Sequence, residues 1–182
     1  MARESSRRDF LALAGGPGLA ALLLPILAPA RKTVAQPRIV AGDTATALVQ
    51  PNAPVHVEDA GAFADTVAKE LHLSYTLVNR GTFTAESVQL MVCAFNDRNL
   101  CVAGEQRTIP RLNLAPGGRM TLATRLSNLL YAPTHRRYVA GVLWVVAANG
   151  QWREQASPVE MQDAMRVHKP LANDSWQFHP NR

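Results

Sequence analysis

The sequence predicts an all-β protein, an antiparallel sandwich of two sheets with about seven strands. Three observations support this prediction. Several stretches alternate apolar and polar residues with a period of two, turn-forming residues separate these stretches, and almost no segment shows the periodicity of a helix. An apolar segment precedes the predicted sandwich, and an irregular tail follows it.

The N-terminal 30 residues have the order of a secretory signal. A short polar start that contains Arg3, Arg7 and Arg8 is followed by the apolar run Phe10–Ala30. That run closes on the small-residue triplet Ala28-Pro29-Ala30, which is a suitable cleavage site. We expect cleavage after this triplet or as late as Ala35.

Within this segment, Ser6-Arg7-Arg8-Asp9-Phe10-Leu11 resembles the twin-arginine export signal, in which a large apolar pair follows the paired arginine after one residue. The resemblance implies that Arg7, Arg8, Phe10 and Leu11 form the export signal. It also implies that the twin-arginine translocase is a partner during export and that the mature protein is periplasmic or secreted.

An uncleaved membrane anchor is the alternative for this segment, because about 20 apolar residues can cross a bilayer. Two prolines and three glycines interrupt the run before its closing triplet, and no second apolar stretch of that length follows. We therefore expect no stable membrane span after cleavage. A lipid anchor is disfavoured because no cysteine lies near the end of the run.

The mature chain has the length of one domain with tails. We expect a leader with one edge strand over 31–69, which includes a brief helix or turn over 62–69. The sandwich is expected over 70–160 and the tail over 161–182. The formal net charge of the whole chain is +5, and its basic residues are dispersed. Nucleic acid is therefore not an expected partner.

The clearest alternation begins at Glu70 and predicts a half-buried strand as far as Leu77. The next strand, from Val88, is apolar on both faces and is expected to be central in its sheet. The most apolar strand is expected over 137–148, and Asn149-Gly150 then turns the chain into a returning strand. Further strands are expected over 106–109, 119–126 and 151–159.

The order of these strands carries a family resemblance. A strand that ends in Leu77-Val78-Asn79-Arg80-Gly81, and the later segment Ile109–Gly117, which contains the turn Ala115-Pro116-Gly117, are similar to segments of the bacterial adhesion-related CARDB domains and their fibronectin type III relatives. The resemblance covers about residues 70–160. It implies an immunoglobulin-like fold and leaves the function open.

Cys93 and Cys101 are expected to form a disulfide, because disulfides persist in an oxidising periplasm. If Asn96-Asp97-Arg98 is a three-residue hairpin turn, the strands fold about Asp97 and Cys93 lies directly opposite Cys101. A redox-active pair is the alternative, although the Cys-x-x-Cys spacing at a helix start is missing.

Three aromatic residues are the candidate contacts with a partner: Trp152, Trp176 and Phe178. Trp144 shares a strand with aliphatic residues and is expected in the core. Trp152 is flanked by Gln151 and Arg153 and is a better candidate for exposure. The tail cannot supply a strand of the predicted sandwich, so it either wraps over the domain and buries Trp176 and Phe178, or it orders on a partner.

The sequence contains no recognisable catalytic machinery. It has no Gly-x-Ser-x-Gly nucleophile motif, and Gly15-Gly16-Pro17-Gly18 lacks the lysine of a phosphate loop and lies in the signal segment. We predict no catalytic residues, no cofactor and no metal. The five histidines lack metal-site spacing and are interpreted as structural or surface residues: His56, His72, His135, His168 and His179.

These patterns favour an exported, non-enzymatic domain that binds another periplasmic protein, as the accessory subunit of a larger redox enzyme. Twin-arginine export often carries cofactor enzymes together with their small subunits. The first alternative is a carbohydrate- or surface-binding module, which is favoured if Trp152 and Tyr138 share one exposed face. The second is a small hydrolase or metal-binding protein, which would need acidic or histidine residues to converge.

Overall fold

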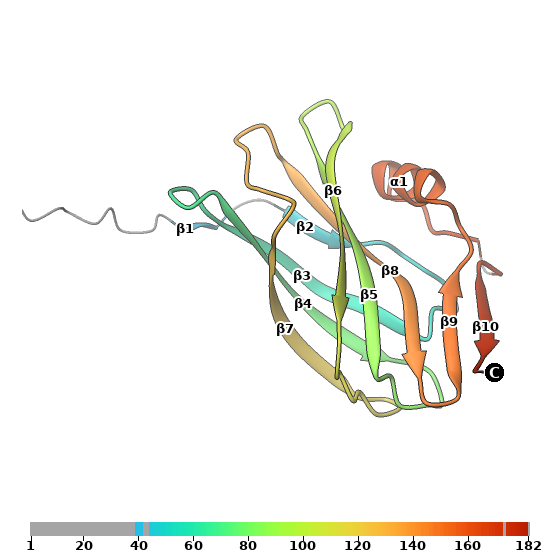
Figure 1. Ribbon diagram of the computed structural model, residues 1–182. Coiled ribbons are helices and arrows are strands. Elements are labelled where there is room, and N and C mark those ends of the chain that lie inside the picture. Colours follow the sequence, from blue (N-terminus) through green and yellow to red (C-terminus); the bar gives the residue numbers. More distant parts are fainter. Residues whose placement is uncertain (1–38, 42–43, 173, 182) are drawn as a thin grey trace, which may run out of the picture. The chain divides into compact units, whose positions relative to one another are not determined.

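The computed structural model describes residues 39–41, 44–172 and 174–181, which contain ten strands and one helix (Figure 1). The predicted export signal, Arg7, Arg8, Phe10 and Leu11 included, lies outside the described residues. The elements in chain order are β1 (Ile39–Ala41), β2 (Thr44–Ala47), β3 (Val55–Asp65), β4 (Glu70–Asn79), β5 (Ser87–Phe95), β6 (Cys101–Ile109), β7 (Arg119–Leu126), β8 (Arg137–Ala147), β9 (Gly150–Glu154), α1 (Pro158–Val167) and β10 (Trp176–Pro180).

The strands form two sheets, and the predicted all-β sandwich is confirmed. One sheet has the order β1-β3-β4-β7, and the other has the order β10-β9-β8-β5-β6 with β2 beside β8. All pairs are antiparallel except β2 with β8, which run parallel from Thr44 opposite Arg137 to Ala47 opposite Ala140. The predicted alternation in β4 buries Leu71, Leu73 and Leu77 completely in the core that the two sheets share.

The strand β5 is apolar on both faces because it lies between two cores. Val88, Leu90 and Val92 pack into the core shared by the two sheets. Cys93 and Phe95 belong to a second cluster on the other face of β5, which α1 covers. The prediction that this strand is central is confirmed, since β5 pairs with both β6 and β8.

The expected leader with one edge strand over 31–69 is wrong. Residues 39–65 supply three strands, and β3 pairs with both β1 and β4. The end of β3 occupies the first half of the segment 62–69, where a helix or turn was expected, and the second half, 66–69, forms a turn. A β-bulge explains the error: the register shifts between Glu58 and Gly61, and Asp59 has a φ of 50°. The extra residue interrupts the alternation that would have revealed the strand.

The tail is also more regular than the sequence analysis predicted. The expected strand over 151–159 stops at Glu154, and α1 then begins with a capping box. Glu160 donates its backbone N–H to Ser157 Oγ, and Ser157 donates its own to the Glu160 carboxylate. The buried residues Met161, Ala164 and Met165 place one face of α1 against the second cluster. Within the described residues, no helix is both long enough and apolar enough to span a bilayer.

The strand β10 adds an edge to the larger sheet by pairing with β9, from Trp176 opposite Glu154 to Pro180 opposite Gly150. The expectation that the tail supplies no strand of the sandwich is therefore wrong. The pairing is confined to a short segment after a Pro-containing connection, where periodicity gives little signal.

Arg137 fastens the C-terminal end of α1 to the sheet. Its guanidinium donates to the carbonyls of Met165 and Arg166, with a donor–acceptor distance of 3.2 Å in each case. It lies 4.7 Å from the centre of the Phe95 ring. It also contacts Asn99 Oδ1 and the His168 ring. A cation at this place satisfies helix carbonyls that have no partner within the helix.

Replacing this guanidinium by an apolar side chain should loosen α1. We expect Arg137→Met to lower the free energy of unfolding by about 1 to 3 kcal/mol, because hydrogen bonds from a charged donor to the helix end are lost. Urea denaturation of the purified protein measures the change. Arg136→Met is the matched control, since Arg136 contacts only the Pro133 carbonyl through its guanidinium in the described structure. Equal losses in the two variants would contradict this role.

Candidate functional site

A cleft of about 470 Å³ lies where the 50–54 turn, the start of β3, the segment after β4, and β9 meet. His56, Arg80, Phe83 and Trp152 line it together with smaller residues. We call it the Trp152 cleft. Its volume lies in the range of sites that hold small ligands or a few side chains of a partner.

Asn79 fixes the segment that forms one wall of the cleft. Its side chain is completely buried, and its Nδ2 donates to the carbonyls of Phe83 and Leu114 at 2.7 and 2.8 Å. Its Oδ1 accepts the Gly81 N–H at 2.9 Å. A Cβ at Gly81 would lie 2.9 Å from the Phe83 ring, so glycine permits the close approach of that ring. The segment Asn79-Arg80-Gly81 thus positions two cleft residues, Arg80 and Phe83.

Three aromatic rings form a stack beside the cleft. The Phe83 and Trp152 rings are 5.9 Å apart between centroids and inclined by 10°, while Trp152 and Phe178 are 5.0 Å apart at 46°. The register of β10 sets this arrangement, because Phe178 lies opposite Trp152. Phe178 is 37% exposed and Trp152 is half-buried. Two of the three residues proposed as partner contacts therefore lie together.

The other aromatic predictions need correction. Trp176 is only 9% exposed and packs in the core between the sheets, so it cannot serve as a surface contact. Trp144 was expected in the core, but its side chain is only half-buried. The Arg153 guanidinium lies 5.4 Å from its ring centre. Tyr138 is completely buried. It therefore shares no exposed face with Trp152.

The charged edge of the cleft contains two arginines that share one carboxylate. Arg80 contacts Glu58 Oε1 at 3.0 Å, and Arg119 contacts Glu58 Oε2 at 2.9 Å. Arg119 also lies 3.6 Å from Asp59, the residue of the β3 bulge. The hydrogen bond from Arg80, followed by that from Arg119, holds the pKa of Glu58 below its usual value.

His56 is the titratable ring in the cleft. Burial lowers its pKa from the ordinary 6.5, and the positive charge of Arg80 lowers it further. The ring is therefore neutral at neutral pH and can accept or donate one hydrogen bond there.

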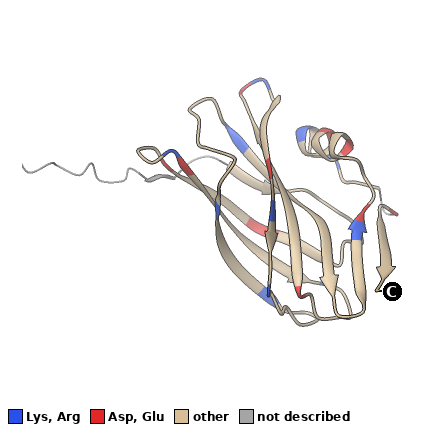
Figure 2. Ribbon diagram, viewed as in Figure 1, with Lys and Arg blue, Asp and Glu red and all other residues tan. Residues whose placement is uncertain are grey.

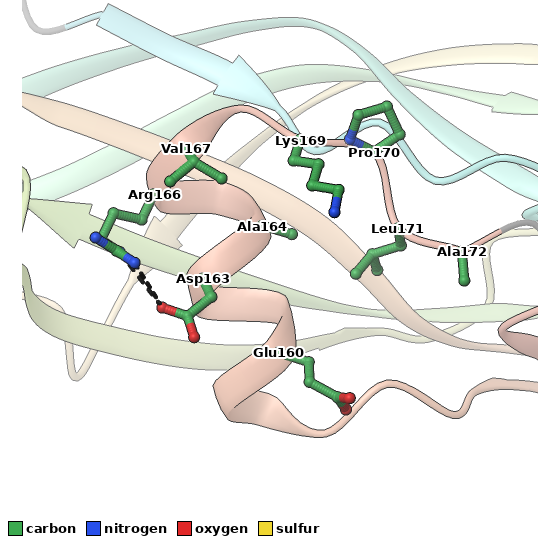
Figure 3. Close-up of a pocket in the computed structure, with 9 residues that line it drawn as sticks. All are labelled: Glu160, Asp163, Ala164, Arg166, Val167, Lys169, Pro170, Leu171 and Ala172. Atoms are coloured by element: carbon green, nitrogen blue, oxygen red, sulfur yellow. Dashed lines mark hydrogen bonds and ion pairs between the residues drawn. The ribbon is translucent and has the colours of Figure 1, made fainter.

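A second groove, of about 590 Å³, runs between α1 and residues 169–172 (Figure 3). Its charges largely satisfy one another. Asp163 and Arg166 form an ion pair at 3.2 Å, and the Glu160 carboxylate accepts the Ser157 N–H at the start of the helix. Lys169 is a further charged residue that lines this groove.

Both cysteines are free thiols, and the predicted hairpin register is wrong. Cys93 lies opposite Gly104, and Cys101 lies opposite Phe95. A longer connection over 96–100 and an irregularity at Ala94/Phe95 shift the register. The Cys101 thiol donates to the Ala103 carbonyl over a distance of 3.6 Å. Burial, followed by the nearby Cys101, raises the pKa of Cys93. A disulfide formed after export stays a prediction.

Neither a metal centre nor a uniform charged face emerges from the described residues. They contain no group of three or more histidine, cysteine, aspartate or glutamate side chains placed to hold a metal ion. Figure 2 shows basic and acidic residues interspersed over the described strands and loops.

Comparisons with protein-family models, with curated proteins and with solved structures gave no match.

The lowered pKa of His56 predicts how stability depends on pH. The unfolded state, with a pKa near 6.5, binds the proton more readily than the folded state does. The contribution of His56 to stability is therefore complete above pH 6.5 and declines as the pH falls through its folded pKa. Urea denaturation between about pH 5 and 8 should show this slope, and His56→Gln should reduce it. A His56 pKa of 6.5 or more by NMR would contradict the prediction.

Proposed function

We propose that the protein is exported through the twin-arginine pathway and acts outside the cytoplasm as a non-catalytic domain that binds another protein. We further propose that its partner is a periplasmic redox enzyme and that this chain is an accessory subunit of the complex. The resemblance of Ser6–Leu11 to the twin-arginine signal supports the export route. The translocase is then a transient partner, and the redox enzyme is the lasting one.

The observation that carries the binding role is the composition of the Trp152 cleft. A half-buried tryptophan, whose ring contacts those of Phe83 and Phe178, lies in one cleft with Arg80. Tryptophan and arginine are enriched at the energetic centres of protein interfaces, where they bury a large apolar area and still offer hydrogen bonds. The supporting rings hold Trp152 in place before binding, which lowers the entropy cost of association.

The carbohydrate-binding alternative has less support. A sugar-binding surface usually presents aromatic faces side by side, but Phe83 and Trp152 stack on each other. Tyr138, the residue expected to share a face with Trp152, is buried. Protein binding through the cleft is therefore the function that the geometry favours.

Blocking the cleft should release the partner. We expect affinity-tagged wild-type protein from the periplasm to retain a stoichiometric protein, identified by mass spectrometry. Trp152→Ala and Thr82→Tyr should weaken its capture at least about tenfold, since Trp152 is a central contact and Thr82 is an exposed residue of the cleft wall. Val159→Ala, on the exposed face of α1, should leave capture unchanged.

The Thr82 variant distinguishes a lost contact from a folding defect. Thr82→Tyr fills the cleft from a surface position without adding a charge, so a loss of binding that it shares with Trp152→Ala is not explained by misfolding. The proposal is wrong if the wild-type protein is isolated alone as a monomer. It is also wrong if neither cleft variant affects the amount of partner retained.

The export route makes a separate prediction. Replacing both Arg7 and Arg8 with lysine should leave the full-length protein in the cytoplasm, because the paired arginine is the feature that the translocase recognises. Cell fractionation and immunoblotting measure the distribution. Arg3→Lys is the control, since Arg3 precedes the motif and should not affect export. Normal export of the double variant would contradict the proposed route.

A further inference from the structure

The ion pairs at the edge of the Trp152 cleft leave one arginine exchangeable. Arg80 pairs with one carboxylate oxygen of Glu58 at a distance of 3.0 Å, and Arg119 pairs with the other oxygen at 2.9 Å. If Arg80 turned away, Arg119 would still neutralise Glu58. The Arg80 side chain is 59% exposed, so water already reaches it and little reorganisation is needed for it to move.

Breaking the Arg80–Glu58 contact costs little because exposed ion pairs contribute little to stability. The same guanidinium gains more when it pairs with a carboxylate inside a cleft from which a partner excludes water. The exchange therefore favours a bound anion. Arg80 belongs to the short segment that the buried Asn79 holds, so its position beside the cleft is set by the fold.

The walls of the cleft are apolar as well as cationic. Phe83 and Trp152 line it together with Pro54, and the Phe83 and Trp152 rings support each other. A ligand that suits both parts combines a carboxylate with an adjoining apolar or aromatic group. Acidic side chains in a protein segment, next to an apolar residue, have this chemistry.

We infer that the Trp152 cleft binds an aspartate or glutamate of the partner protein, with Arg80 exchanging Glu58 for the partner's carboxylate. An apolar residue beside that acidic residue packs against Phe83 and Trp152. The inference rests on the proposed protein-binding function of this cleft and specifies the chemistry of its partner.

Two small peptides test the chemistry directly. N-acetyl-Phe-Asp-amide carries the proposed combination, and N-acetyl-Phe-Asn-amide has nearly the same shape without the charge. Titration into the mature protein, followed through the indole N–H signal of Trp152 by NMR, should show binding of the acidic peptide about tenfold tighter, the factor that a charge-assisted hydrogen bond supports.

Two pairs of variants separate the exchange from general electrostatic attraction. Arg80→Gln should remove the preference for the acidic peptide, whereas Arg111→Gln removes the same charge from a residue that lines a different cleft and should have no effect. Glu58→Gln should strengthen binding of the acidic peptide several-fold because it frees Arg80. Asp59→Asn removes a neighbouring charge that contacts Arg119 and should leave the affinity unchanged.

The outcomes distinguish this inference from the proposed function. Equal binding of the two peptides, no binding of either, or equal effects of Glu58→Gln and Asp59→Asn would overturn the inference. If Trp152→Ala still abolished capture of the natural partner, protein binding would stand and only the carboxylate chemistry would fail. If Trp152→Ala still captured the natural partner, both the carboxylate chemistry and the protein-binding role of the cleft would be wrong.

Discussion

The buried side chain of Asn79 is the interaction on which the candidate site depends. It sits at the end of β4, and its amide satisfies the carbonyls of Phe83 and Leu114 and the N–H of Gly81. Its backbone bonds to Gly117 and Gly118 in the turn before β7. Unpaired polar groups in this buried place would each cost free energy, so the amide fixes several chain segments at once. The wall of the Trp152 cleft is one of them.

The C-terminal residues complete the second core and support Trp152, which lines the cleft. Because β5 is apolar on both faces, the larger sheet needs a cover, and α1 supplies it with Met161 and Met165. Arg137 then holds the end of that helix. The chain continues into β10, which places Phe178 against Trp152. A tail that looks like a linker in sequence therefore helps to shape the proposed binding surface.

The sequence predicted the fold where local periodicity reports burial, as in β4 and β5. It failed where one residue breaks the period, because the bulge at Asp59 concealed β3. It also failed at the turn after β5, because the longer connection over 96–100, together with the irregularity at Ala94/Phe95, moved Cys101 away from its expected partner. The capping box that starts α1 was a detectable signal that the strand prediction overlooked. The cleft could not be predicted, because Arg80 and Trp152 meet only through the pairing of distant strands. Trp152 and Phe178 could be nominated from residue type alone, but the same reasoning wrongly included Trp176, whose burial depends on tertiary packing.

The paired arginines on Glu58 are better explained by positioning than by stability. Exposed ion pairs contribute little to the stability of the fold. Here two guanidiniums share the carboxylate of Glu58, and Asp59 provides a second anion beside Arg119. This arrangement holds the Arg80 guanidinium near the cleft, but its ion pair with Glu58 is weak enough to be exchanged for another. The aromatic rings of Phe83 and Trp152 lower the entropy cost of binding because they are already ordered. Arg80 lowers the cost for a different reason, since its ion pair with Glu58 is easily broken. The Trp152 cleft combines both properties in a segment fixed by a single buried amide.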